Sequence, residues 1–150
     1  MWDPNFGSSM SWNLQNVFIG QLRLGARTVL LWNLALDEWH GPTVGANGCT
    51  NCRGVVTTYG NRAHDKNVEY YTLGHFSQHI RPGARRLESQ GYESQNLENV
   101  FFQNPDGSVV GVVANMESNG ATKTFQIQLD GIWYYYENLP SRSVITFFKN

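Results

Sequence analysis

Residues suited to binding a sugar lie within and just after one apolar stretch of this 150-residue sequence. The stretch "TVLLWNLALDE" runs from Thr28 to Glu38 and contains Trp32 and Asn33, and His40 follows it. The face of a Trp ring suits the C–H surface of a sugar, and indole, amide and imidazole groups can hydrogen-bond hydroxyls. Trp32, Asn33 and His40 are therefore candidate substrate-binding residues. The alternatives are a core Trp, an Asn that ties the strand to a helix, and a solvated loop His.

The carboxylates at the end of this stretch are not predicted to catalyse a reaction. A pair of carboxyl groups that acts as acid and nucleophile must flank the bond that is broken. Asp37 and Glu38 are adjacent, so in an extended strand their side chains point to opposite faces. We expect ordinary loop-entry carboxylates, solvated or capping, and we assign no catalytic residue in this chain.

The cysteines and two of the histidines do not predict a metal site. Cys49 and Cys52 in "CTNC" are too few for a four-ligand zinc site. They form either a short disulfide-closed loop, if the chain meets an oxidising compartment, or two reduced thiols. His75 and His79 share one helical face without a third ligand, which favours buried or interface histidines. We expect no metal and no cofactor.

The composition excludes several classes of protein. Hydrophobic residues make up 41%, aromatic residues 13% and charged residues 15%, with a formal net charge of −1. This apolar content argues against disorder, and the charge gives no reason to expect a nucleic-acid partner. No apolar run approaches the roughly 20 residues of a membrane span. The start "MWDPNFGSSM" lacks the features of a signal peptide.

The first half of the chain has the pattern of helices around one apolar strand. Residues 1–10 are predicted to be a loop, residues 13–24 and 67–80 helices, and "RGVVTTY" a short strand that turns at Gly60 and Asn61. Gly25 is suited to end the first helix. The stretch from Thr28 to Leu36 is apolar on both faces, which is typical of a strand covered on both sides in a parallel sheet.

The pattern changes after Gly83. Six short β-rich runs follow one another: "ARRLES", "LENVFFQ", "SVVGVVAN", "TKTFQIQL", "IWYYYENL" and "SVITFFK". Turn signals separate several of them, among them "NPDG", "MESNG" and "DG". Short strands with tight turns predict an antiparallel sandwich.

Four segments, in order, carry a resemblance to a known family: "WNLALDE" followed by "GP", "CTNCRGVV", "YYTLGHFSQHIRPGARRL" and "NPDGSVVGVVAN". They resemble the C-terminal part of glycoside hydrolase family 30, in its glucosylceramidase-like branch. The resemblance implies an α+β fold: a C-terminal piece of a (β/α)8 barrel over residues 1–82, then an antiparallel β-sandwich over residues 83–150. The opening stretch would be the eighth barrel strand.

The same resemblance implies a function. Members of the family are retaining β-glycosidases with two catalytic glutamates, and both are expected to fall outside these 150 residues. The family position that matches Trp32 lines the sugar subsite. The expected substrate is a β-glucoside such as glucosylceramide or a β-glucan. The expected partner is the missing N-terminal barrel portion, or a second copy through self-association. Full-length members are typically secreted.

One alternative of another class remains. The chain is then a stand-alone, non-catalytic carbohydrate-binding or assembly module that uses exposed aromatic residues. Tyr134, Tyr135 and Tyr136 could form such a platform, whereas ordinary core and sheet-surface packing is the other explanation for this run.

Overall fold

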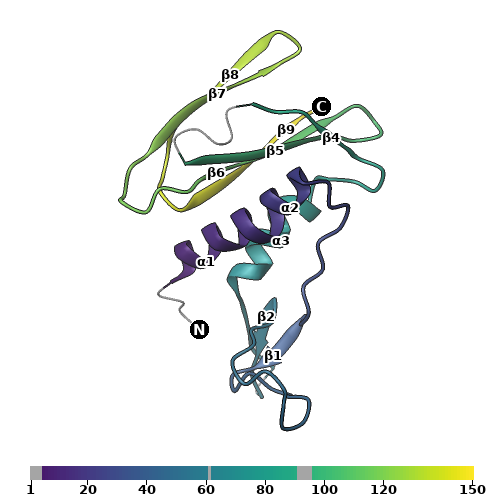
Figure 1. The fold of residues 1–150 in the computed structure, drawn as a ribbon, viewed down its shortest axis with the longest axis vertical. Helices are drawn as coiled ribbons and strands as arrows, with labels where there is room; N and C mark the ends of the chain where they lie inside the picture. Colours follow the sequence, from purple (N-terminus) through teal and green to yellow (C-terminus); the bar gives the residue numbers. More distant parts are fainter. Residues whose placement is uncertain (1–4, 61, 91–95) are drawn as a thin grey trace.

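A four-stranded sheet lies between a long hairpin on one side and helices on the other (Figure 1). The computed structural model describes residues 5–60, 62–90 and 96–150. A small sheet lies beyond the helices, at the end of the molecule opposite the hairpin. The architecture is mixed α and β with mainly antiparallel pairing, which the sequence predicts at this level of detail.

One continuous helical segment begins the described chain. It consists of α1 (Phe6–Asn13), the π-helical η1 (Leu14–Ile19) and α2 (Gly20–Arg23). The loop predicted for residues 1–10 is wrong for residues 6–10, and residues 1–4 lie outside the described residues.

The early helix start has a tertiary cause. Met10 is buried, and its sulfur lies 3.2 Å from Thr72 Oγ1. Burial of this side chain outweighs the weak helix propensity of the Gly and Ser residues around it. At the other end Gly25 takes a φ of 99°, and Ala26 N donates to Gln21 O at 3.0 Å. Gly25 therefore ends the helix as predicted, because a left-handed conformation costs glycine little.

The stretch from Thr28 to Leu36 is not the doubly covered strand that its composition predicts. Its last residues alone enter β1 (Ala35–Asp37), and no strand of the described chain pairs with residues 28–32. Leu30, Trp32 and Leu34 are 89%, 95% and 76% exposed. Val29 and Leu31 on the opposite side pack against the core between the helices and the larger sheet. The segment is therefore covered on one face.

A small three-stranded sheet follows. β1 pairs in parallel with β2 (Val56–Thr58), and β2 pairs antiparallel with β3 (His64–Lys66). The prediction of a strand in "RGVVTTY" is confirmed, although Asn61 of the predicted turn lies outside the described residues. The sequence did not predict β3, because "HDK" is short and polar.

The second helix, α3 (Val68–Ser77), occupies most of the predicted range 67–80. Its buried face differs from the predicted one. Val68, Thr72 and Phe76 are buried, whereas Tyr70 of the predicted apolar face is 41% exposed. Phe76 stacks on Phe18 of η1, with ring centroids 5.0 Å apart.

All six runs predicted after Gly83 form strands. They are β4 (Arg85–Leu87), β5 (Leu97–Gln103), β6 (Val109–Asn115), β7 (Lys123–Leu129), β8 (Ile132–Leu139) and β9 (Ser143–Lys149). The larger sheet has the order β4-β5-β6-β9, and β7 and β8 form a separate hairpin.

The strand that is covered on both faces is β6. All seven of its residues are buried, because the helices pack on one face of its sheet and the hairpin on the other. The helix-side core contains Met10, Leu14, Phe18, Ile19, Val68, Phe76, Val100, Phe102, Val112 and Ala114. The hairpin-side core contains Phe101, Val109 and Val113, with partly buried neighbours such as Phe125, Ile127 and Ile145. The sandwich therefore has a core on each face of its larger sheet.

Buried polar side chains fix the connections between these layers. Asn104 Nδ2 donates to His79 O at 2.9 Å, and its Oδ1 accepts from Arg81 N at 2.9 Å. Asn115 Nδ2 donates to Ala121 O and Leu139 O, each at 2.9 Å. Each amide satisfies backbone groups at a chain reversal, so replacing either would leave buried groups without partners.

We expect folding stability to fall as the pH drops below about 6.5, the usual pKa of histidine. His75 Nδ1 lies 2.8 Å from Thr146 Oγ1 on β9, and burial lowers the pKa of His75. At a pH between the lowered pKa of His75 in the folded chain and its ordinary pKa in the unfolded chain, the unfolded chain binds more protons than the folded chain. The contribution of neutral His75 is therefore fully present above the unfolded pKa and is lost as the pH falls toward the folded pKa.

Thermal unfolding at about pH 7.5 and about pH 5.5 tests this linkage. The His75→Gln variant should lose part of the pH dependence of Tm. A His79→Gln variant serves as the matched control. His79 is also a half-buried histidine that contacts β9, where its ring stacks on Phe148 with the centroids 5.1 Å apart. Equal pH slopes in the wild type and in His75→Gln would contradict the prediction.

Candidate functional site

The candidate residues lie around β1 and the loop that follows it. Trp32 is the most exposed of them and stands three residues before β1. Because neighbouring residues in an extended chain alternate sides, Val29 and Leu31 anchor the segment on the core between the helices and the larger sheet while Trp32 points away from it. Its ring is therefore accessible to a flat apolar ligand surface.

Asn33 is held by its backbone against β2. Its carbonyl accepts from Val55 N at 3.0 Å, and the carbonyl of Leu34 accepts from Val56 N at 3.0 Å. Asn33 is half-buried, unlike its neighbours Trp32 and Leu34. This backbone pairing joins the segment to the chain at β2 and not to a helix, and it involves no atom of the Asn33 side chain, so both a ligand contact and a tie to a helix stay predictions.

Asp37 organises the loop after β1. Its Oδ1 accepts from Trp39 N at 2.9 Å and from Gly41 N at 2.7 Å. Asp37 N donates to Gly41 O at 2.9 Å, which closes the turn around His40. This is the capping role expected for a loop-entry carboxylate.

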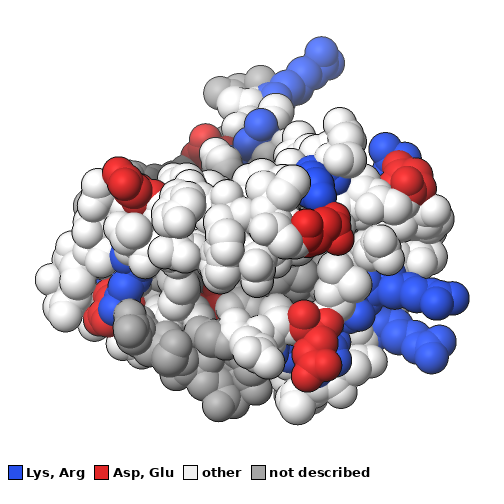
Figure 2. Space-filling model, turned by 90° about the horizontal axis from the view of Figure 1, so that it is seen from above, with Lys and Arg blue, Asp and Glu red and all other residues white. Residues whose placement is uncertain are grey.

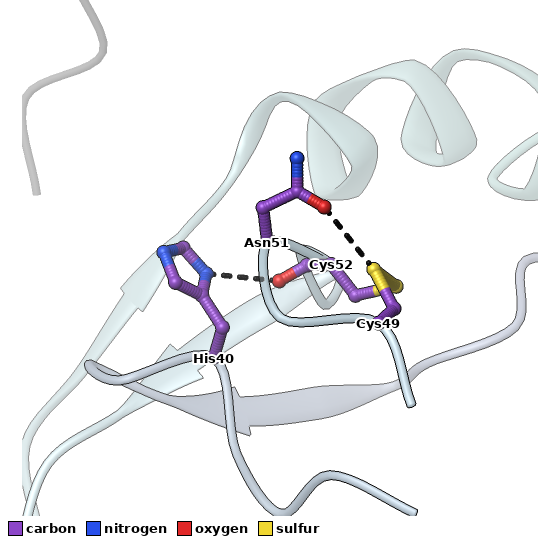
Figure 3. Close-up of a disulfide and its surroundings, with 4 residues drawn as sticks. All are labelled: His40, Cys49, Asn51 and Cys52. Carbon is purple, nitrogen blue, oxygen red and sulfur yellow. Dashed lines mark hydrogen bonds between the residues drawn. A yellow bond between two sulfur atoms is a disulfide. The ribbon is translucent and has the colours of Figure 1, made fainter. Parts of the chain in front are cut away.

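His40 connects that turn to the cysteine loop (Figure 3). It has a φ of 64°, and its Nδ1 lies 2.9 Å from Cys52 O. A carbonyl oxygen can only accept, so Nδ1 carries the proton and Nε2 of the neutral ring is left as an acceptor. His40 can therefore accept a hydrogen bond from a ligand hydroxyl at Nε2 while its other nitrogen holds the loop.

Cys49 and Cys52 are joined as a disulfide, with their Cα atoms 5.5 Å apart. Asn51 Oδ1 lies 3.3 Å from Cys49 Sγ, inside the closed loop (Figure 3). A disulfide in so short a loop restricts the backbone around Cys52, whose carbonyl oxygen accepts the hydrogen bond from His40. His40 and the disulfide therefore act as one loop unit.

The structure does not bring all the candidates together. His40 and Cys52 meet, but Trp32 precedes β1 whereas His40 follows it. In the described residues no hydrogen bond or ring contact joins Trp32 to His40 or Asn33. Among the described residues, His40 therefore contacts the cysteine loop, whereas Trp32 makes no hydrogen bond or ring contact with the other two candidates.

Three further residues position this region and were not predicted to do so: Asn67 and the ion pair of Arg53 and Glu69. Asn67 Nδ2 donates to Gly54 O and to Thr57 Oγ1, each at 2.9 Å. Arg53 pairs with Glu69 at 2.8 Å. An Asn directly before a helix is a capping signal, but Asn67 instead fixes the loop that leads from the disulfide into β2.

Metal ligands do not gather in the part of the chain that the structure describes. No group of three or more His, Cys, Asp or Glu residues is placed to hold a metal ion there. His75 and His79 each contact β9, through Thr146 and Phe148 respectively. Among the described helices, none is long and apolar enough to cross a membrane.

Comparison with known proteins supports a common ancestry with glycosidases. Residues 83–147 match the model of the glycosyl hydrolase family 30 beta sandwich domain. The chain is 31% identical over 150 residues to the endo-1,6-beta-D-glucanase neg1 of Aspergillus fumigatus. This alignment covers 97% of this chain and 30% of the glucanase. It is 37% identical over 93 residues to the lysosomal acid glucosylceramidase of Mus musculus, covering 62% of this chain and 18% of that protein.

Solved structures show the same relation. The endo-beta1,6-glucanase BT3312 superposes with a TM-score of 0.82 at 27% identity, over 93% of this chain and 30% of the glucanase. SrfJ from Salmonella typhimurium superposes with a TM-score of 0.85 at 26% identity, over 99% of this chain and 32% of SrfJ.

The chain spans about 30% of the length of the glucanases that it matches. The sequence match and the superposition both extend beyond the sandwich and cover almost the whole chain. Residues 83–147 form a glycoside hydrolase family 30 β-sandwich domain, and the chain corresponds to the C-terminal part of proteins of that family.

Proposed function

We propose that this chain is the C-terminal part of a retaining β-glycosidase that acts on a β-glucan or on a glucosylceramide-like β-glucoside. The observation that carries the proposal is the 31% identity to an endo-1,6-β-glucanase over 97% of the chain. In this proposal residues 1–82 complete a (β/α)8 barrel and residues 83–150 form the sandwich that packs beside it.

The chain would contribute substrate contacts, and the catalytic glutamates would come from the rest of the barrel. Trp32 would pack against a sugar ring, and His40 Nε2 would accept a hydrogen bond from a hydroxyl. Asn33 would add a contact at the edge of the same subsite. Asp37 has no catalytic role in this proposal; its Oδ1 accepts two backbone hydrogen bonds and holds the turn around His40.

The place of Trp32 in the chain supports its assignment as a sugar contact. Trp32 is 95% exposed among the described residues, and Leu30 and Leu34 on the same side are also largely exposed, so this side is available to a ligand or to the rest of the proposed barrel. In barrel enzymes, side chains at the carboxyl ends of the strands form the active site. A Trp in the segment that would become the eighth strand is placed to face that end once the barrel is complete.

A chimera tests the proposal. The C-terminal 30% of the Aspergillus fumigatus glucanase is replaced by this chain, and release of reducing ends from a β-1,6-glucan is measured. We expect the chimera to hydrolyse the glucan and the 150-residue chain alone to show no turnover, since two flanking carboxyl groups are needed. Trp32→Ala in the chimera should lower kcat/KM about 5- to 150-fold, the loss of one stacking contact by analogy with bases on aromatic rings.

The matched control is Trp12→Ala, which removes an exposed Trp from α1. It should leave kcat/KM unchanged, and circular dichroism should show that both variants fold. Two outcomes would contradict the proposal. One is hydrolysis by the chain alone that disappears in Asp37→Ala or Glu38→Ala. The other is a folded Trp32→Ala chimera with wild-type kinetics.

A further inference from the structure

The aromatic run of β8 is divided between the two faces of the hairpin. Tyr134 contacts Phe147 edge to face at 5.1 Å between ring centroids, and Tyr136 stacks on Phe125 at 5.5 Å. These two tyrosines are therefore explained by packing against β9 and β7. Trp133 and Tyr135 alternate with them and point to the opposite face, where they are 51% and 67% exposed.

Amide side chains accompany these two rings on the neighbouring strand. In the register of the hairpin Trp133 pairs with Gln128, and Tyr135 pairs with Gln126. Both glutamines are exposed. Residues two apart on a strand are separated by about 7 Å, so the two aromatic–amide pairs form a short row along the hairpin. We call Trp133, Tyr135, Gln126 and Gln128 the hairpin platform.

The chemistry of the hairpin platform selects its ligand. None of its four side chains is charged. The nearest charged residues along the hairpin are Glu137, two positions beyond Tyr135, and Asp130, two positions beyond Gln128, which pairs with Lys149. Viewed from the hairpin side, the molecule is largely uncharged, with Lys, Arg, Asp and Glu in scattered groups (Figure 2). An anionic nucleic acid or an acidic peptide would find no counter-charge on this row. Aromatic faces flanked by amides suit the C–H faces and hydroxyls of an uncharged sugar chain.

The hairpin also borders a hollow. Gln126, Gln128 and Trp133 line a groove of about 450 Å³ that continues toward Ser89 and Gln90. A polymer lying on the row therefore has a hollow beside it that is lined by apolar side chains such as Phe101 and Phe125 as well as by polar ones.

We propose that the hairpin platform is a second carbohydrate-binding site, remote from Trp32, that holds an uncharged β-glucan chain on the sandwich. The ligand class rests partly on the proposed function, whereas the location rests on the exposure and register of β7 and β8. The site adds no chemical step. It keeps the polysaccharide near the molecule and requires no residue of the barrel.

Affinity electrophoresis of the 150-residue chain tests this site independently of hydrolysis. The chain is run in native gels that contain soluble β-1,6-glucan or soluble β-1,3-glucan, and in gels without glucan. We expect retardation by at least one glucan. In the Trp133→Ala/Tyr135→Ala double variant we expect association at least about tenfold weaker, because two stacking contacts are removed.

Three variants make the result specific. Trp133→Phe/Tyr135→Phe keeps both rings and should retain the retardation, which separates loss of binding from loss of fold. Trp12→Ala should be retarded like the wild type. Trp32→Ala should keep most of the retardation even if the chimera shows that Trp32 acts in hydrolysis, so the two proposals can fail separately.

Two results would overturn the platform. One is a wild-type chain that neither glucan retards. The other is a folded double variant that is retarded like the wild type.

Discussion

A Gly111→Val variant should lose about 3 kcal/mol or more of its free energy of unfolding, as expected for overpacking in a core that cannot expand. Gly111 on β6 lies directly opposite Phe101 on β5. A Cβ at Gly111 would overlap Cε1, Cδ1 and Cζ of the Phe101 ring. Phe101 is itself buried between the sheet and the hairpin, so moving its ring aside would disturb the hairpin-side core. Such a loss is a large part of the 5–15 kcal/mol that typical domains have.

Urea unfolding followed by circular dichroism measures this loss. Gly74→Ala is the matched control, because no atom lies within 4 Å of a Cβ added at Gly74 in α3. It should be neutral or stabilising by up to about 1 kcal/mol, the usual difference between Gly and Ala in a helix. A Gly111→Ala variant should also be destabilised. Adding Phe101→Leu to it should recover part of that loss, because the two side chains are in contact and the smaller one makes room for the added Cβ. If Gly111→Val unfolds at the same urea concentration as Gly74→Ala, the packing account of β6 fails.

The isolated 150-residue chain should self-associate, or bind a complementary barrel fragment, through the exposed side of residues 30–34. Leu30, Trp32 and Leu34 lie on one side of this segment and are largely exposed. Each contributes about 1.5–3 kcal/mol when it is fully buried, and contiguous apolar surface of this kind drives association. Light scattering over a range of protein concentrations should show a rising apparent mass. Leu30→Ser/Leu34→Ser should reduce that rise, whereas Thr124→Ser on the hairpin should not.

Hydrogen exchange gives an independent measure of the same segment. None of the amides of residues 28–34 donates a backbone hydrogen bond to the described part of the chain. They should exchange fast in dilute monomer, while the amides of β5 and β6 exchange slowly. Burial of residues 30–34 in an assembly should slow them. A compact monomer with strong protection from Thr28 to Leu36 would show that the chain covers this segment itself, which would contradict the proposed barrel fragment.

Local patterns were sufficient for much of the fold. The six strands after Gly83 were predictable because turn signals separate several of the β-rich runs, and turn chemistry depends on a few neighbouring residues. The end of the first helix at Gly25 was predictable for the same reason, since a positive φ is a local requirement. The helix start at Phe6 was not predictable, because it depends on the contact of Met10 with a residue 62 positions away.

The candidate site was predictable in residue type and not in arrangement. Trp32, Asn33 and His40 were identified from the chemistry of their side chains. The bond from His40 to Cys52 and the role of Asn67 join residues brought together by the loops, so no short stretch of sequence contains them. The division of Trp133 and Tyr135 from Tyr134 and Tyr136 follows from strand alternation, but which pair faces outward depends on where β9 lies.

The sequence by itself determined where apolar runs, turns and aromatic residues stand along the chain. It could not distinguish "TVLLWNLAL" from "SVVGVVAN" as the strand covered on both faces, because both are continuous apolar runs. Only the tertiary structure decided this. β6 is covered because helices and hairpin from distant parts of the chain pack on its two sides, whereas Leu30, Trp32 and Leu34 meet no such layer among the described residues. Burial is a property of the neighbours that a segment meets in space, and its own residues specify only that it needs them.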